Sequence, residues 1–301
     1  MIDGAARTIL TCGALAFTAY EMGSGPVVLC LHGFPDTPMT FRHLLPAIAQ
    51  AGYRGVAVTM RGYEPSSQPK DGRYSLSALT EDVGTWLDAL NADEAHLVGH
   101  DWGAAAGYAA AALLPKHVFT VTMMAVPHPA LFAKVGMRSL RQLRRSWYIG
   151  FFQLGGFAEF AVAQNDWAFL EMLWRRWSPQ WQPPNDHIGD VRAHFSKPGV
   201  AAAALAYYRA AFDRRAPGYA QSEALVAGPI SAPTLGITGA REGCIGTDVF
   251  EKCMPARFFT GGVSVARIAK AGHFVHLEEP DEVNGRITAH LASAGRHLSP
   301  V

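Results

Sequence analysis

Short apolar runs alternate with segments of helical pattern along most of the chain. The apolar runs cover residues 26–31, 55–59, 95–98, 119–126, 233–238 and 263–268. Runs of this length are typical of strands that are buried on both faces of a sheet. Apolar residues at helical spacing occupy residues 40–51, 76–90 and 104–114. The alternation predicts an α/β fold, with a mostly parallel central sheet flanked by helices. We expect residues 8–20 to form a two-stranded β unit that opens this fold.

One long region breaks this alternation. Its patterns look helical throughout, and five of the seven tryptophans of the chain fall within it. We therefore predict a core in two parts, residues 1–128 and 227–301, with a helical lid inserted at residues 129–226. Pockets of open α/β sheets form at the strand ends, where we expect the lid to sit.

Composition excludes several classes of protein. Of the 301 residues, 49% are hydrophobic and 17% are charged, which favours a large core over disorder. The net charge of +1 provides no field that would attract nucleic acid or an anionic membrane. No apolar segment is long enough to span a bilayer, and the four cysteines lack the spacing of a zinc site or a disulfide framework. We expect a cytoplasmic protein without a metal. We interpret the basic run of Arg138, Arg141, Arg144 and Arg145 as the solvated face of a helix.

Asp101 lies at the centre of a Gly-x-Asp-x-Gly pattern between a predicted strand and a predicted helix. Gly99 and Gly103 stand two residues before and two after it, as a sharp turn around a nucleophile requires. A carboxylate is ionised at neutral pH and needs no base in order to attack a saturated carbon. Asp101 is therefore the candidate nucleophile. The alternative is that it only caps the following helix.

An ester formed on Asp101 must be hydrolysed, which requires a base that activates water. His273 follows the last predicted strand and is the candidate; His276 is the alternative. The acid that orients this histidine is sought after the strand that ends at Thr238. Glu242 lies nearest that strand end. The alternatives are Asp248 and Glu251.

Hydrolysis of an ester also needs hydrogen-bond donors for the tetrahedral oxyanion. The expected donors are the backbone N–H of Trp102, just after the nucleophile, and that of Phe34 in the first loop. Loss of one such donor typically costs about 3 kcal/mol of transition-state stabilisation.

Four motifs together resemble the α/β-hydrolase fold epoxide hydrolases of the soluble type, which use an Asp nucleophile. They are His32-Gly33-Phe34-Pro35-Asp36, Met60-Arg61-Gly62-Tyr63, Gly99-His100-Asp101-Trp102-Gly103-Ala104 and Gly272-His273-Phe274. The resemblance implies that Asp101 opens the ring of a lipophilic epoxide and that His273 and Glu242 activate water to hydrolyse the ester. It implies a small-molecule epoxide and water as the reaction partners, and no metal or organic cofactor.

The same resemblance places two lid tyrosines beside the epoxide oxygen, whose alkoxide is a poor leaving group without a proton donor. They correspond to Tyr148 and Tyr208, with Tyr207 as the alternative to Tyr208. We expect four aromatic residues to contact substrate, namely Phe34, Trp102, Trp147 and Phe152.

Two departures from the family pattern and two alternative functions remain. Glu242 occupies the position that more often holds Asp, and Glu64 follows Tyr63 where the family usually has Gly. A haloalkane dehalogenase would share Asp101 and Trp102, but such enzymes commonly have Asn at the position of Phe34. A ligand receptor without activity could be built on the same scaffold. The sequence leaves the oligomeric state open, with a homodimer as one alternative.

Overall fold

A single eight-stranded sheet forms the centre of the computed structural model, which describes residues 2–295. The strands are β1 (Ala6–Cys12), β2 (Leu15–Met22), β3 (Val27–Leu31), β4 (Arg54–Val58), β5 (Ala95–His100), β6 (Val118–Met124), β7 (Thr234–Gly239) and β8 (Val263–Ile268). Their order is β1-β2-β4-β3-β5-β6-β7-β8. Strands β1 and β2 form the predicted antiparallel unit, and β2 also pairs antiparallel with β4. From β4 to β8 all pairs are parallel, which confirms the predicted fold class.

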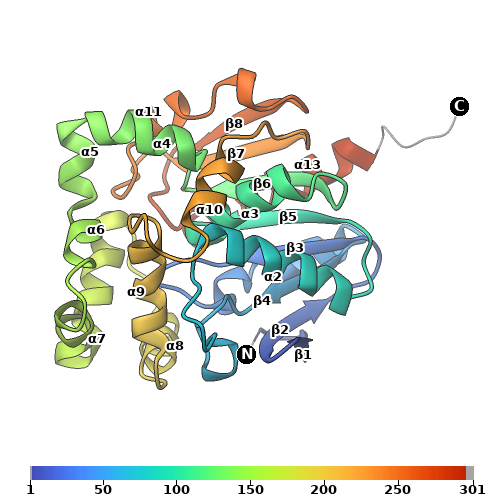
Figure 1. Cartoon of the computed structure of the whole chain (residues 1–301). Helices are drawn as coiled ribbons and strands as arrows, with labels where there is room; N and C mark the ends of the chain where they lie inside the picture. The colour runs from blue at the N-terminus through green and yellow to red at the C-terminus, as the bar shows by residue number, and fades with distance from the viewer. Residues whose placement is uncertain (1, 296–301) are drawn as a thin grey trace, which may run out of the picture.

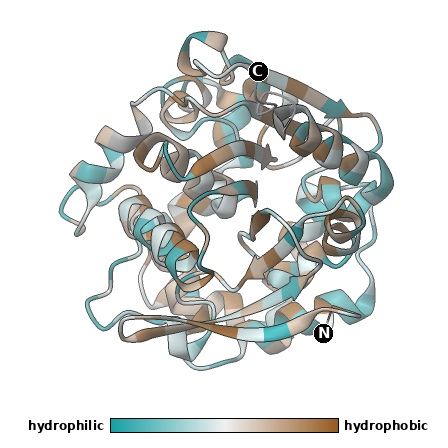
Figure 2. Cartoon of the chain, turned by 90° about the vertical axis from the view of Figure 1, so that its right-hand side faces the viewer, coloured by the Kyte–Doolittle hydropathy of each residue, from teal (hydrophilic) through white to brown (hydrophobic). Residues whose placement is uncertain are grey.

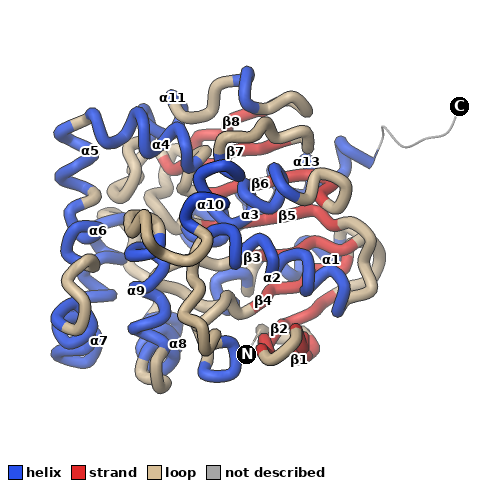
Figure 3. The backbone as a smooth tube through the Cα atoms, viewed as in Figure 1, coloured by secondary structure: helices blue, strands red, loops and turns tan. Residues whose placement is uncertain are grey.

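Helices cover both faces of the sheet (Figure 3). The core helices are α1 (Leu44–Gln50), α2 (Leu76–Ala89), α3 (Trp102–Leu113), α11 (Thr247–Lys252), α12 (Val275–Glu278) and α13 (Pro280–Gly295). Three short 3-10 turns accompany them at Pro38–Phe41, Pro65–Ser67 and Ala256–Phe258, and a fourth, Gly136–Arg138, lies between β6 and β7. Side chains of α2 and α3 share one hydrophobic cluster with the sheet, and those of α1 and α13 share the other.

The strand β3 shows why its apolar run is continuous. Leu29 and Leu31 point into the cluster under α2 and α3, whereas Val28 and Cys30 point into the cluster under α1 and α13. Successive side chains alternate between faces, so a strand covered on both sides needs apolar residues at every position. Figure 2 shows hydrophobic residues along the central strands and hydrophilic residues on the outer turns of the helices.

The predicted helix at residues 40–51 begins later than expected. A 3-10 turn occupies Pro38–Phe41, and α1 starts only at Leu44. Pro46 lies in the first turn of α1, where its missing N–H has no partner to lose. A continuous helix from residue 40 would bring the ring of Pro46 against the carbonyl of Arg42.

Seven helices lie between β6 and β7. They are α4 (Pro129–Val135), α5 (Leu140–Arg145), α6 (Trp147–Phe151), α7 (Phe157–Trp177), α8 (Asn185–Phe195), α9 (Val200–Ala210) and α10 (Tyr219–Val226). Helices α5 to α9 stand together beside one end of the sheet (Figure 1), whereas α4 contacts α11 and α10 contacts α2 and α3. Residues 164–167 inside α7 have non-helical backbone angles, so α7 consists of two helical segments. Within residues 2–295, no helix has the length and apolar character needed to cross a bilayer.

Candidate active site

Asp101 occupies a sharp turn between β5 and α3. Its φ of +52° and ψ of −118° lie outside the regions that residues other than glycine ordinarily adopt, so the backbone is strained at the nucleophile. A Cβ on Gly103 would press on the backbone carbonyl of Leu31, and one on Gly99 would press on that of Gly103. The two glycines are therefore required by the close approach of the backbone around the turn. Asp101 stands at the N-cap position of α3, but its side chain makes no capping hydrogen bond. The capping alternative is therefore wrong.

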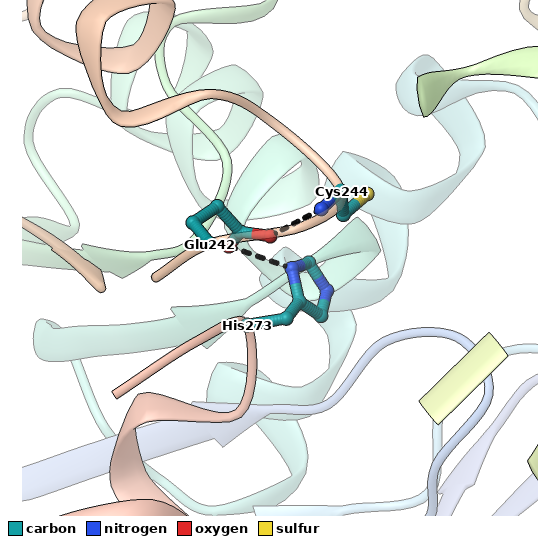
Figure 4. A group of neighbouring side chains, drawn as sticks. All are labelled: Glu242, Cys244 and His273. Atoms are coloured by element: carbon teal, nitrogen blue, oxygen red, sulfur yellow. Dashed lines mark hydrogen bonds and ion pairs between the residues drawn. The ribbon is translucent and has the colours of Figure 1, made fainter. Parts of the chain in front are cut away.

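The structure brings three predicted site residues together at the carboxyl ends of the strands. His273, in the loop between β8 and α12, has its Nδ1 atom 2.9 Å from Oε2 of Glu242. Its Nε2 atom lies 3.6 Å from Oδ2 of Asp101. Glu242 is on the loop after β7, and its Oε1 atom accepts a hydrogen bond from the N–H of Cys244 over 2.6 Å (Figure 4). The same atom accepts one from the N–H of Ile245 over 3.3 Å. These bonds fix the carboxylate, which in turn fixes the imidazole ring.

Burial and neighbouring charges shift the pKa values of His273 and Asp101 in opposite directions. Burial lowers the pKa of His273, but the charge of Glu242 and the contacts with Asp101 outweigh it and raise this pKa to about 10. Burial raises the pKa of Asp101, but the hydrogen bond and charge of His273 outweigh it and lower this pKa below its ordinary value. The arrangement therefore holds an ionised carboxylate at position 101 beside an imidazolium.

The alternatives for the base and the acid lie elsewhere. His276 is buried, and its Nε2 atom forms a 2.5 Å hydrogen bond with Thr40. Asp248 is exposed at the start of α11, and Glu251 pairs with Arg267 on the surface. None of the three contacts the ring of His273. Glu242 is one methylene longer than the Asp more often found at its position, and the loop accommodates this length so that the carboxylate still bonds His273.

The backbone N–H of Phe34 contacts the carboxylate of Asp101. The N–H of Phe34 donates to Oδ1 of Asp101 over 2.8 Å. Gly33 allows this approach, because a Cβ there would lie 2.5 Å from the Cβ of Asp101 and 2.6 Å from the backbone nitrogen of Trp102. The N–H of Phe34 therefore bonds the nucleophile, and the backbone nitrogen of Trp102 lies in the same turn. The role of both as oxyanion donors stays a prediction.

The loop that departs from the family pattern at Glu64 is fixed to the sheet. The carboxylate of Glu64 accepts hydrogen bonds from the N–H of Thr18 (2.6 Å) and from its hydroxyl (2.9 Å). At the start of the same loop, the N–H of Met60 donates to Nε2 of His32. The acidic side chain thus anchors the loop to β2 and stays away from Asp101.

Tyr148 of α6 and Tyr208 of α9 pack against each other, with ring centroids 5.8 Å apart. The hydroxyl of Tyr208 has no hydrogen-bond partner within residues 2–295, and that of Tyr148 lies 3.2 Å from Sγ of Cys244. Burial raises the pKa of both phenols well above the ordinary value. They are therefore neutral hydrogen-bond donors at physiological pH. Tyr207, the alternative to Tyr208, donates its hydroxyl to the carbonyl of Arg61.

A cavity of about 460 Å³ joins these groups. Its lining includes Asp101, Trp102, Tyr148, Tyr208 and Cys244. Residues of α4 and α10 and residues 74–76 complete the wall of the cavity. No sequence pattern had indicated that these segments line it.

Three of the four predicted substrate contacts lie outside the lining of this cavity. Trp147 is partly exposed and lies outside this cavity, against Phe151 and Phe169. The rings of Phe34 and Phe152 also lie outside the lining and pack edge-on against Tyr208, with centroids 5.4 and 5.0 Å away. They support the phenol instead of walling the cavity. Trp102 alone lines the cavity as predicted.

Cys244 is a neighbour of the site that sequence reasoning missed. Its thiol, the carboxylate of Glu242 and the ring of His273 offer ligand atoms within 4.8 Å of one another, a set that zinc can use (Figure 4). Glu242 and His273 already bond each other, so a metal ion would have to break that pair. The available signal was the position of Cys244, two residues after the candidate acid.

The amino-acid sequence is similar to a known family and to several curated proteins. The family model described as alpha/beta hydrolase fold matches residues 26–280. "Epoxide hydrolase 4" of Mus musculus is 29% identical over 90% of this chain and 74% of its own length. "Epoxide hydrolase" of Caballeronia sordidicola is 48% identical over 36% of this chain and 33% of its own length.

Solved structures have a similar fold over nearly the whole chain. The epoxide hydrolase from an endophytic Streptomyces has a TM-score of 0.81 and 25% identity, covering 98% of this chain and 97% of its own. Epoxide Hydrolase A from Mycobacterium thermoresistibile has a TM-score of 0.79 and 26% identity, covering 96% and 98%.

Proposed function

We propose that this chain, which belongs to the α/β-hydrolase fold family, is an epoxide hydrolase that converts lipophilic epoxides to vicinal diols. The comparisons confirm the α/β-hydrolase fold family, and the epoxide hydrolases among the similar proteins support the proposed activity. The observation that carries the proposed activity is the position of the Asp101 carboxylate in one cavity with two neutral phenols, Tyr148 and Tyr208.

In the first step, a carboxylate oxygen of Asp101 attacks a ring carbon of the epoxide. The new C–O bond forms an ester while the bond between that carbon and the ring oxygen breaks. The ring oxygen takes a proton from Tyr148 or Tyr208, because an alkoxide is a poor leaving group without one. The lid therefore supplies the acid and the core supplies the nucleophile.

In the second step, water hydrolyses the ester. His273 removes a proton from water, and the resulting hydroxide attacks the ester carbonyl carbon. The N–H groups of Phe34 and Trp102 stabilise the oxyanion. Breaking the bond between the acyl carbon and the alkyl oxygen releases Asp101 as a carboxylic acid and the product as an alkoxide. The alkoxide takes up the proton held by His273, the carboxylic acid of Asp101 passes its proton to His273, and the diol leaves.

The charge of Asp101 controls when His273 can act. While Asp101 is ionised, its contacts help to raise the pKa of His273, so the ring is protonated and cannot accept a proton. Ester formation removes that charge and leaves Glu242 as the one remaining carboxylate partner. The pKa of His273 then falls, so the ring gives up its proton, which restores the tyrosine that protonated the ring oxygen. The neutral ring is then a base when water must be activated.

The helical insertion, residues 129–226, acts as the lid because it carries both phenols. The steps above use only side chains and backbone groups of this chain, so the proposal needs no metal or organic cofactor. The phenols also favour an epoxide over a haloalkane, since a halide leaves without a proton. A cytoplasmic location and a homodimer remain predictions, to be tested by cell fractionation and by sedimentation.

The deciding experiment offers the purified protein a panel of styrene-type, aliphatic and fatty-acid epoxides beside matched bromoalkanes. We expect diol from at least one class of epoxide and no halide from the bromoalkanes. Halide release without diol formation would establish a dehalogenase instead. Binding of an epoxide without any turnover would identify a receptor on this scaffold.

A further inference from the structure

Four arginines converge on a second cavity, of about 310 Å³, on the lid. Its lining consists of Arg141, Arg144, Arg145, Arg176, Trp177 and Gly243. Three of the arginines come from α5, one from the end of α7, and Gly243 from the loop that carries Glu242. The arginines of α5 are indeed mostly exposed, as predicted, but they face a hollow that a second helix also lines.

These arginines lack acidic partners. Within residues 2–295, no carboxylate lies within 4.0 Å of the guanidinium nitrogens of any of the four. Arg175, directly before Arg176, forms an ion pair with Glu171, and so does Arg192. The lid therefore neutralises arginines nearby but leaves the four around this cavity uncompensated.

Helix stability explains part of this arrangement. Arg144 and Arg145 lie in the last turn of α5, and Arg176 lies in the last turn of α7, where cations favour the helix dipole. That effect acts on each helix separately. It gives no reason for both ends to meet at one cavity, where like charges repel. A bound anion would remove the repulsion.

We propose that this cavity binds the phosphate group of a small organic phosphate. Guanidinium groups match phosphate oxygens with paired, charge-assisted hydrogen bonds. A phosphate offers three oxygens and close to two negative charges, so it can engage several of the arginines at once. The volume lies at the lower end of the range for small-molecule pockets.

This site adjoins the catalytic candidates without sharing the substrate cavity. A guanidinium nitrogen of Arg145, Nη1, donates to the carbonyl of Glu242 over 3.0 Å. The ring of Trp177 has its centroid 4.9 Å from that of His273. No residue lines both cavities. An anion held by Arg145 would therefore contact the loop that positions the acid, while the epoxide cavity stays open.

Calorimetric titration with inorganic phosphate and with phenyl phosphate tests the proposal, at constant ionic strength set by chloride. We expect saturable binding of one equivalent to the wild-type protein. The double variant Arg141→Gln/Arg144→Gln should bind at least about tenfold more weakly, because it loses charge-assisted hydrogen bonds without touching the Glu242 loop. The matched control is Arg138→Gln/Arg214→Gln, which removes the same charge from two exposed arginines outside the cavity. It should bind as the wild type does.

Three results would overturn the proposal. They are the absence of saturable binding to the wild type, equal loss of affinity in both double variants, and binding of succinate as tight as that of phosphate. Thermal unfolding of each variant verifies that it is folded. The titration involves no turnover, so its outcome is independent of whether the chain hydrolyses epoxides.

Discussion

The Nδ1 atom of His273 lies 2.9 Å from Oε2 of Glu242, and neither side chain is exposed to solvent. A buried pair of this kind is strongly coupled to protonation, because each charge compensates the other in a medium of low polarity. With Asp101 on the other side of the ring, the pKa of His273 rises to about 10. The resting protein therefore contains an imidazolium between two carboxylates.

This relationship predicts a loss of stability at alkaline pH. The ordinary histidine pKa near 6.5 applies to the unfolded chain, and the folded value is about 10. The protonated ring therefore stabilises the fold fully below pH 6.5, and this contribution is lost as the pH rises towards 10. Between pH 7 and 10 we expect the free energy of unfolding to fall by about a few kcal/mol, because a difference of one unit in the pKa of His273 corresponds to about 1.4 kcal/mol. Urea unfolding across this range measures it.

Glu242→Gln is the control for that pH dependence. It removes the charge that raises the pKa of His273, so its stability should change less between pH 7 and 10 than that of the wild type. Parallel pH profiles for the two proteins would show that the pair does not titrate as we describe.

Replacement of the base should trap the covalent intermediate. In His273→Gln, Asp101 can still attack, but no group activates water, so turnover should fall by about 100- to 10,000-fold. Intact-protein mass spectrometry after incubation with an epoxide should detect a gain equal to the mass of that epoxide. The double variant Asp101→Asn/His273→Gln lacks the nucleophile and should show no gain. Undiminished diol formation by His273→Gln without an adduct would contradict the covalent route.

The core of the site was predictable because its constraints are local in sequence. Gly99 and Gly103 surround Asp101 at a spacing that the backbone requires, whatever the rest of the chain does. His273 and Glu242 follow strands of a parallel sheet, and the carboxyl ends of such strands meet at one edge. The sequence therefore contained enough information to bring these three side chains together.

The lid was less predictable because its helices are short and its contacts are distant in sequence. Helix α6 spans only Trp147–Phe151, too few residues for a periodic pattern to indicate which face meets the cavity. Trp147 was consequently assigned to the substrate although it lies outside the cavity. The contact between Tyr148 and Cys244 depends on how the lid packs on a core loop 96 residues away. No local pattern encodes that packing.

Removal of both lid phenols should disable epoxide opening. Tyr148→Phe/Tyr208→Phe retains the rings but removes the two donors, so turnover should fall by about 100- to 1,000-fold. Tyr108→Phe is the control, because it loses a buried hydroxyl that bonds Met254 and is not part of the cavity lining. Initial rates of diol formation compare the variants. Near-normal rates in the double variant would exclude the phenols as acids, and a larger loss in Tyr207→Phe than in Tyr208→Phe would transfer the role to Tyr207.

The same substitution, Gly to Ala, should have opposite effects at two positions. In Gly103→Ala the added methyl group meets the backbone carbonyls of Leu31 and His32, which cannot rotate away. We expect a loss of about 1–3 kcal/mol in the free energy of unfolding, and displacement of Asp101 from its donors. In Gly189→Ala the methyl group enters open space on the exposed side of α8, where Ala stabilises a helix by about 0.5–1 kcal/mol. Urea unfolding of both variants measures the difference, and equal stabilities would show that the turn around Asp101 does not depend on a glycine at position 103.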